Sequence, residues 1–111
     1  MITPEASACI KVAACVCGKD GIISSEEEAE MLRILTESIS DFTEEDLDRT
    51  LDEFFESTNQ MEDYLRAIQD PELIKFTLYL SRSSASRDGL DLMENIALQK
   101  AIAYWGVNPD E

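Results

Sequence analysis

Carboxylates stand at two turns of the sequence, and carboxylate oxygens are ligands that hard divalent cations such as calcium prefer. The first turn lies in the segment CGKDGIISSEEE, residues 17–28, and offers Asp20 and Glu27. The second turn offers Asp88 and Glu94. Three neighbouring side chains could complete the two ligand sets: Ser24, Glu28 and Asp91. These residues form a candidate site for a weakly bound divalent cation, and no other cofactor is expected.

The first turn has part of the pattern of an EF-hand calcium loop. Its glycine precedes Glu27 by six positions, as the glycine of an EF-hand precedes the last ligand. In an EF-hand loop ending at Glu27, however, Val16 and Gly18 would occupy the first and third ligand positions, and neither has a side-chain oxygen. Calcium takes about six to eight oxygen ligands. The segment is therefore not expected to be an EF-hand, and Asp20 and Glu27 remain as a weaker carboxylate pair.

Helix capping explains the same residues without a ligand. Ser24 and Glu27 have the spacing of a capping box, in which each side chain accepts a hydrogen bond from the backbone of the other residue. The run Glu26–Glu28 would also interact favourably with the positive end of a helix dipole. At the second turn, Arg82 and Arg87 could neutralise the acids instead of a metal. Capping alone and capping with weak cation binding both fit the sequence.

The chain contains no histidine, and it has three cysteines, Cys9, Cys15 and Cys17. Without histidine the chain lacks the commonest general base and the usual partner of cysteine in a zinc site. Cys15 and Cys17 lie two positions apart, so on a helix they would point to different faces and make a poor metal clamp. We therefore expect a protein that is not an enzyme, with reduced cysteines that act as small apolar side chains.

Negative charge is concentrated in the middle of the chain. Residues 26–63 hold 15 of the 24 acidic residues and only two cations, Arg33 and Arg49, so this stretch carries −13 of the net charge of −15. Such a field repels nucleic acid and anionic lipid and attracts cations and basic proteins. The stretch is therefore either a solvated surface that keeps the protein in solution or a docking face for a basic partner protein. Mimicry of nucleic acid is a third interpretation, although acids alone do not show a phosphate-like spacing.

No stretch approaches the roughly 20 uninterrupted apolar residues of a membrane span. The N-terminal residues also lack the basic region of a signal peptide, and Lys11 interrupts their apolar run. We expect a cytoplasmic protein that does not insert into a membrane, and its oligomeric state is left open.

Helix signals run from end to end, whereas the alternation typical of strands is hard to find. Ser, Thr, Asn and Asp begin helices by capping them, and proline is favoured at the first helical position. Six start signals occur: Thr3-Pro4-Glu5, Ser24-x-x-Glu27, Thr43-x-x-Asp46, Asn59-x-x-Glu62, Asp70-Pro71-Glu72 and Asp91-x-x-Glu94. Gly106 is placed to end the last helix. The sequence predicts an all-α, compact bundle of about six helices in a single domain, residues 1–111.

Two parts of this helix pattern repeat. The signals at Thr3 and Asp70 are 67 positions apart, and so are those at Ser24 and Asp91. An Asp-Gly dipeptide separates the two helices of each pair, at an offset of 68. The sequence therefore predicts two helix–loop–helix pseudo-repeats, about 3–39 and 70–106, with the third and fourth helices as an insert.

The two copies resemble the TerB-like family, which is named for a tellurite-resistance protein. The first copy reads VAACVCGKDGIISSEEEAEMLRIL and the second LYLSRSSASRDGLDLMENIALQKAIAYWGV. In that family a helix ends in a small residue and an Asp-Gly turn, and a glutamate opens the next helix. The resemblance spans nearly the whole chain, although Lys19 puts a positive charge before Asp20 and the second Asp-Gly lies one residue closer to its glutamate.

The resemblance implies an all-helical bundle with metal-binding acids at the two turns, here Asp20 and Glu27, and Asp88 and Glu94. It also implies a role in a metal, oxyanion or general stress response, carried out with protein partners of a resistance system. The competing hypothesis is an acidic interaction or inhibitor module that binds a basic partner without metal.

Overall fold

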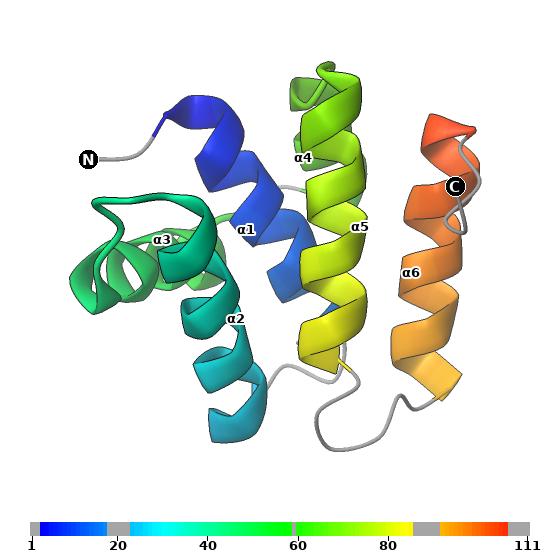
Figure 1. Cartoon of the computed structure of the whole chain (residues 1–111). Coiled ribbons are helices and arrows are strands. Elements are labelled where there is room, and N and C mark those ends of the chain that lie inside the picture. The colour runs from blue at the N-terminus through cyan, green and yellow to red at the C-terminus, as the bar shows by residue number, and fades with distance from the viewer. Residues whose placement is uncertain (1–2, 18–22, 59, 86–91, 107–111) are drawn as a thin grey trace.

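The computed structural model describes residues 3–17, 23–58, 60–85 and 92–106, except for the side chains of 92–94 (Figure 1). Within these ranges the chain forms six helices and no strand, which confirms the predicted all-α bundle. The helices are α1 (Pro4–Cys17), α2 (Ser25–Ser38), α3 (Glu44–Glu56), α4 (Met61–Ala67), α5 (Pro71–Ala85) and α6 (Leu92–Trp105). No helix of the described ranges has the length and apolar character needed to cross a membrane.

The predicted start signals of α1, α2, α3 and α5 are confirmed by hydrogen bonds. Thr3 Oγ1 accepts from the backbone N–H of Ala6 at 3.1 Å, and Asp70 Oδ1 accepts from that of Glu72 at 2.9 Å. Capping boxes begin α2, at Ser24 and Glu27, and α3, at Thr43 and Asp46. These contacts satisfy backbone donors that have no partner inside a helix.

The predicted start of α4 was wrong by one residue. The sequence pattern placed the cap at Asn59 with Glu62, whereas the helix begins after Gln60, whose backbone N–H donates to Asp63 Oδ2 at 2.9 Å. Asn59 lies outside the described residues. Asp63 is the third helical residue after Gln60, the position from which an acid can reach back to the cap, so a second acid one residue after Glu62 decided the register.

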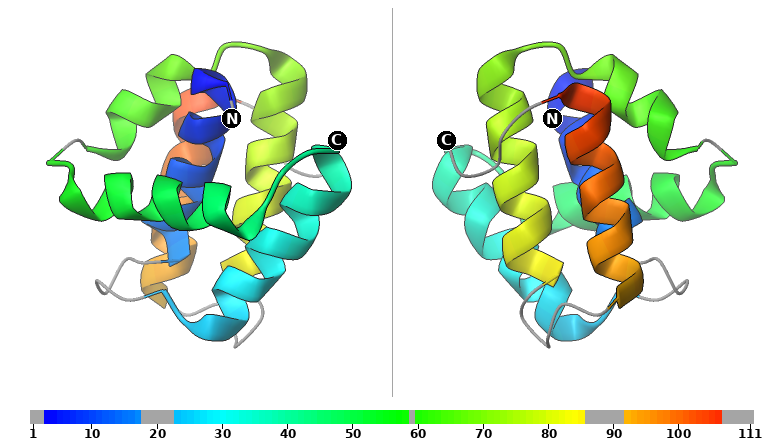
Figure 2. Two further views of the ribbon diagram at one scale, coloured as in Figure 1. Left: turned by 90° about the vertical axis from the view of Figure 1, so that its left-hand side faces the viewer. Right: turned by 90° about the vertical axis from the view of Figure 1, so that its right-hand side faces the viewer.

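Helices α1 and α5 lie at the centre of the bundle and pack against each other, with α6 at one edge and α2, α3 and α4 around the remaining sides (Figures 1 and 2). Most of α1 is buried, including Ile10, Val12 and Val16. On α5, Leu80 is fully buried and Thr77 donates from Oγ1 to the Leu73 carbonyl at 2.6 Å. Helices α1 and α5 therefore form the core against which the other helices pack.

The three cysteines lie on α1, and Cys9 and Cys17 are buried. Burial raises the pKa of the Cys9 thiol, which keeps it protonated and unreactive at neutral pH. At least Cys9 thus packs as the small apolar side chain that the sequence predicted.

Corresponding helices of the two predicted repeats begin 67 residues apart, α1 at Pro4 and α5 at Pro71, α2 at Ser25 and α6 at Leu92. α2 packs on α5 and α6 packs on α1, as a two-fold relation between the repeats would require. The relation is incomplete, because α6 also packs on its own neighbour α5, whereas α2 packs chiefly on α5. The chain turns out of α6 at Gly106, whose φ of +64° is one that glycine adopts without strain.

Candidate functional site

The structure places only part of the predicted cation site. Asp20, Asp88 and Asp91 lie outside the described residues, and Glu94 belongs to α6 with its side chain outside them. The members that the structure places stand at the start of α2: Ser24, Glu27 and Glu28. A cation site at either turn therefore stays a prediction.

Glu27 is buried, with 3% of its surface exposed, although it lies in the first turn of a helix. Its Oε1 accepts from the Ser24 backbone N–H at 2.9 Å, and its own backbone N–H donates to Ser24 Oγ at 3.1 Å. The second oxygen, Oε2, is buried and has no hydrogen-bond partner in the described part of the molecule. A buried polar atom without a partner is unfavourable by about 1–3 kcal/mol, so Oε2 has capacity for one more donor or a cation.

Glu28, the next residue, faces the third helix instead. Partial burial raises the pKa of its carboxyl, and the neighbouring Asp48 raises this pKa further through its charge and a hydrogen bond. The charge of Glu44 acts in the same direction. Carboxylates from α2 and α3 therefore lie close together, and burial together with their repulsion favours the protonated form of Glu28.

The outer face of α3 is the most acidic surface among the described helices. The helix contains seven acids and a single cation, Arg49, in 13 residues. Six of the acids are exposed: Glu44, Glu45, Asp48, Asp52, Glu53 and Glu56. The remaining acid, Asp46, caps the helix. The hydrogen bond that its carboxylate accepts from the backbone N–H of Thr43 lowers the pKa of the carboxyl. Asp46 is thus the one acid of α3 that caps the helix.

An exposed aromatic side chain stands at the C-terminal end of this acidic face. Phe55 has 52% of its surface exposed, and its ring meets that of Phe54 edge to face at a centroid distance of 5.2 Å. Phe54 is half-buried and lies 6.2 Å from the ring of Tyr64 on α4. The Phe55 ring is therefore supported by the core while much of it remains open to solvent.

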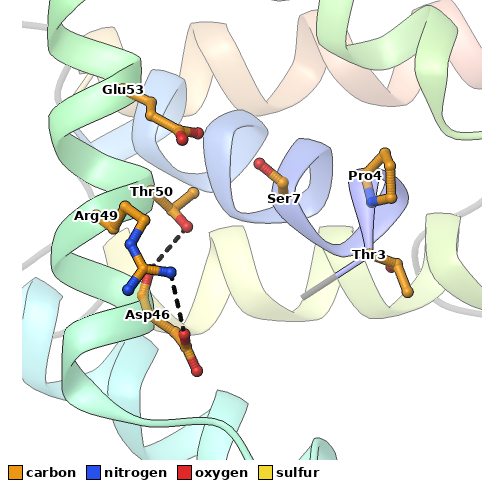
Figure 3. Close-up of a pocket in the computed structure, with 7 residues that line it drawn as sticks. All are labelled: Thr3, Pro4, Ser7, Asp46, Arg49, Thr50 and Glu53. Atoms are coloured by element: carbon orange, nitrogen blue, oxygen red, sulfur yellow. Dashed lines mark hydrogen bonds and ion pairs between the residues drawn. The ribbon is translucent and has the colours of Figure 1, made fainter. Parts of the chain in front are cut away.

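A small open pocket of about 230 Å³ lies between the first turn of α1 and α3 (Figure 3). Arg49 reaches Asp46 Oδ1 at 3.7 Å on its α3 side, and Ser7 lies on its α1 side. Glu53, at its rim, pairs with Lys11 Nζ at 3.3 Å. The cation and the two acids of the lining thus already have partners of opposite charge within the protein.

Among the described residues, no three cysteine, aspartate or glutamate side chains are grouped so that they could hold a metal ion together. The chain matches no protein-family model, no curated protein and no solved structure. The resemblance to the TerB-like family therefore stays a hypothesis that rests on the sequence motifs alone.

Sequence reasoning identified the charge of this region but not its geometry. The run of acids predicted a negative face, and the helical period could have placed Asp48, Asp52 and Phe55 on one side of α3. The approach of Glu28 to Asp48 depends on how two helices pack. The burial of Glu27 depends on the same packing, and neither carries a local signal.

Proposed function

We propose that this protein is a non-enzymatic binding domain whose acidic α2–α3 face docks a basic protein partner. The observation that supports the proposal is the exposure of six carboxylates on α3 beside those of α2, with few cations between them. Surface charge of one sign attracts oppositely charged proteins and speeds their association. By contrast, α5 carries Glu72, Lys75 and Arg82, and its exposed side has no comparable excess of acids.

The resemblance to the TerB-like family suggests the pathway in which this binding domain acts. We place it in a cytoplasmic metal, oxyanion or general stress response, in which it acts through a partner of a resistance system. An inhibitor module that occupies the basic site of another protein would use the same surface, so the docking proposal holds for either setting.

Titration with a ten-residue lysine peptide, followed by backbone amide chemical shifts, tests the docking proposal. At about 20 mM NaCl the shifts should be confined to residues 25–56, and ~0.5 M NaCl should abolish them because salt screens exposed charges. Equal shifts over α5 and α6, or no binding at low salt, would refute an α2–α3 docking face.

A second candidate function, weak binding of a divalent cation at the first turn, is favoured by the unpartnered Oε2 of Glu27. A carboxylate oxygen that is buried and lacks a donor can bind a cation at little further desolvation. The cation would join the capping box to Asp20, as the sequence predicts.

Calcium, magnesium, manganese and zinc titrations distinguish the two functions. Localised amide shifts at residues 20–28 and 88–94 support a cation site, and Glu27→Gln should remove those at 20–28. Diffuse shifts over residues 26–63 that vanish in about 0.15 M NaCl would show only screening of the acidic surface, and would leave the docking proposal in place.

A further inference from the structure

Four exposed residues of α3 form one line along the helix. Glu44, Asp48 and Asp52 are four positions apart, and Phe55 follows three positions later. Residues three and four apart are neighbours on a helix surface, about 5–6 Å from one another. We call these four residues the α3 strip. The strip presents three carboxylates at one-turn intervals and ends in an aromatic ring.

The two ends of the strip differ in a way that selects among cationic partners. At the N-terminal end Glu28 of α2 adds a fourth carboxyl, beside Asp48 and Glu44. At the C-terminal end Phe55 offers a half-exposed ring that meets the ring of Phe54 edge to face. A row of carboxylates attracts any cation, but an aromatic ring adds a preference for arginine, whose planar guanidinium both pairs with carboxylates and stacks on rings.

The strip itself has helical spacing, which indicates the form of the segment that fits it. A second helix laid along α3 presents its own residues four apart at the same interval of about one turn. In an extended chain the side chains of one face are about 6.6 Å apart, a slightly longer interval than that of the strip, so a helix is the closer match.

Building on the proposed docking function, we propose that the α3 strip binds an arginine-bearing helix of a partner protein. Arginines four residues apart face Glu44, Asp48 and Asp52, and a further arginine stacks on Phe55. The charge complementarity identifies the partner as a basic segment, and the exposed ring identifies arginine as the residue at the end of the line.

Three synthetic alanine-based helical peptides test this inference by isothermal titration at about 50 mM NaCl. The first carries four arginines in one line with the spacing of the strip, the second carries the same arginines distributed around the helix, and the third has lysines in place of the aligned arginines. We expect the aligned arginine peptide to bind about tenfold more tightly than the distributed one, since only it meets all carboxylates at once. The lysine peptide should bind about threefold more weakly.

Variants of the protein locate the contact. Phe55→Leu keeps an apolar side chain against Phe54 but removes the aromatic ring. It should weaken binding of the aligned arginine peptide about threefold to fivefold and binding of the lysine peptide less. Phe55→Ala should act in the same way, with its fold checked by thermal unfolding. Glu72→Gln, which removes an exposed acid of α5, is the matched control and should leave the affinity unchanged.

Equal affinities for the aligned and distributed arginine peptides, together with no effect of Phe55→Leu, would overturn the α3 strip. Binding of both peptides would then still support an acidic docking face of no fixed register. Failure of the wild-type protein to bind any of the three peptides would overturn the docking function as well.

Discussion

Helices α1 and α5 face each other through apolar and uncharged side chains, whereas α2 and α3 turn carboxylates toward each other. On α1, Ile10 and Val12 are fully buried, and α5 contributes Leu80 to the same core. Between α2 and α3, partial burial and the charges of Asp48 and Glu44 raise the pKa of Glu28. The contact of α1 with α5 has the composition of a hydrophobic core, whereas carboxylates of α2 and α3 repel one another. The acids of α2 and α3 therefore add little to the core, and the proposed docking function would give them a role.

The largest difference between the two regions should appear when one large apolar side chain is removed from each. Leu80→Ala leaves a cavity in the core and should lower the free energy of unfolding by about 2–5 kcal/mol. Phe55→Ala removes a half-exposed ring and an edge-to-face contact, and should lower it by about 1 kcal/mol or less. Urea unfolding monitored by circular dichroism measures both, and similar losses would contradict the separation of the two regions.

The second-largest effect should come from the capping box at the start of α2. Glu27→Ala removes the acceptor of the Ser24 N–H and should destabilise the protein by about 1 kcal/mol. Glu27→Gln retains an acceptor oxygen and gives the Oε2 position a donor, so it should be less destabilising. Thermal unfolding with the exposed Glu26→Ala as control checks this order. If the glutamine variant is the worse of the two, the negative charge itself is needed at this position, as a cation site would require.

Removing charges from the acidic face should weaken peptide binding without lowering the stability of the protein. The double variant Asp48→Asn, Asp52→Asn should bind the aligned arginine peptide about fivefold more weakly, since exposed ion pairs contribute some tenths of a kcal/mol each. Its free energy of unfolding should stay equal to that of the wild type or rise, because Asp48 repels Glu28. Titration calorimetry and urea unfolding on the same samples test both halves of this expectation. A less stable variant would show that these acids serve the fold.

The smallest effect should be a pH dependence that runs opposite to the usual behaviour of a carboxyl. Because the pKa of Glu28 is raised in the folded protein, the folded state holds this proton more tightly than the unfolded chain. Its contribution to stability is complete below the ordinary glutamate pKa of 4.5 and falls as the pH rises through the folded value. Glu28→Gln should remove this fall and gain about 0.3 kcal/mol at pH 7.

Asp46 provides the contrast within the same pair of helices. The pKa of Asp46 is lowered, so its contribution is present above the ordinary aspartate pKa of 3.8 and is lost as the pH falls through the folded value. Asp46→Asn should therefore flatten the acid limb of a stability–pH curve, whereas Glu28→Gln flattens the part above pH 4.5. Identical curves for the two variants would contradict their opposite environments.

The fold could be predicted from the sequence because its signals are local. Thr3, Ser24 and Thr43 each cap a helix through a hydrogen bond to a residue three positions away, a distance that the sequence displays directly. The error at α4 has the same origin, since two acids in succession offered two registers. The approach of Glu28 to Asp48, 20 positions apart, depends on how two helices pack, and no local pattern reports that.

Trp105, at the end of α6, donates from its indole Nε1–H to the Leu65 carbonyl of α4 at 3.2 Å. It is the only tryptophan of the chain, so light that excites tryptophan but not tyrosine excites a single position, at the contact between these two helices. The emission therefore reports whether α6 remains packed against α4, and it should be unchanged when a peptide binds to α3. This optical reporter separates an opening of the bundle from an event on its acidic surface without any label.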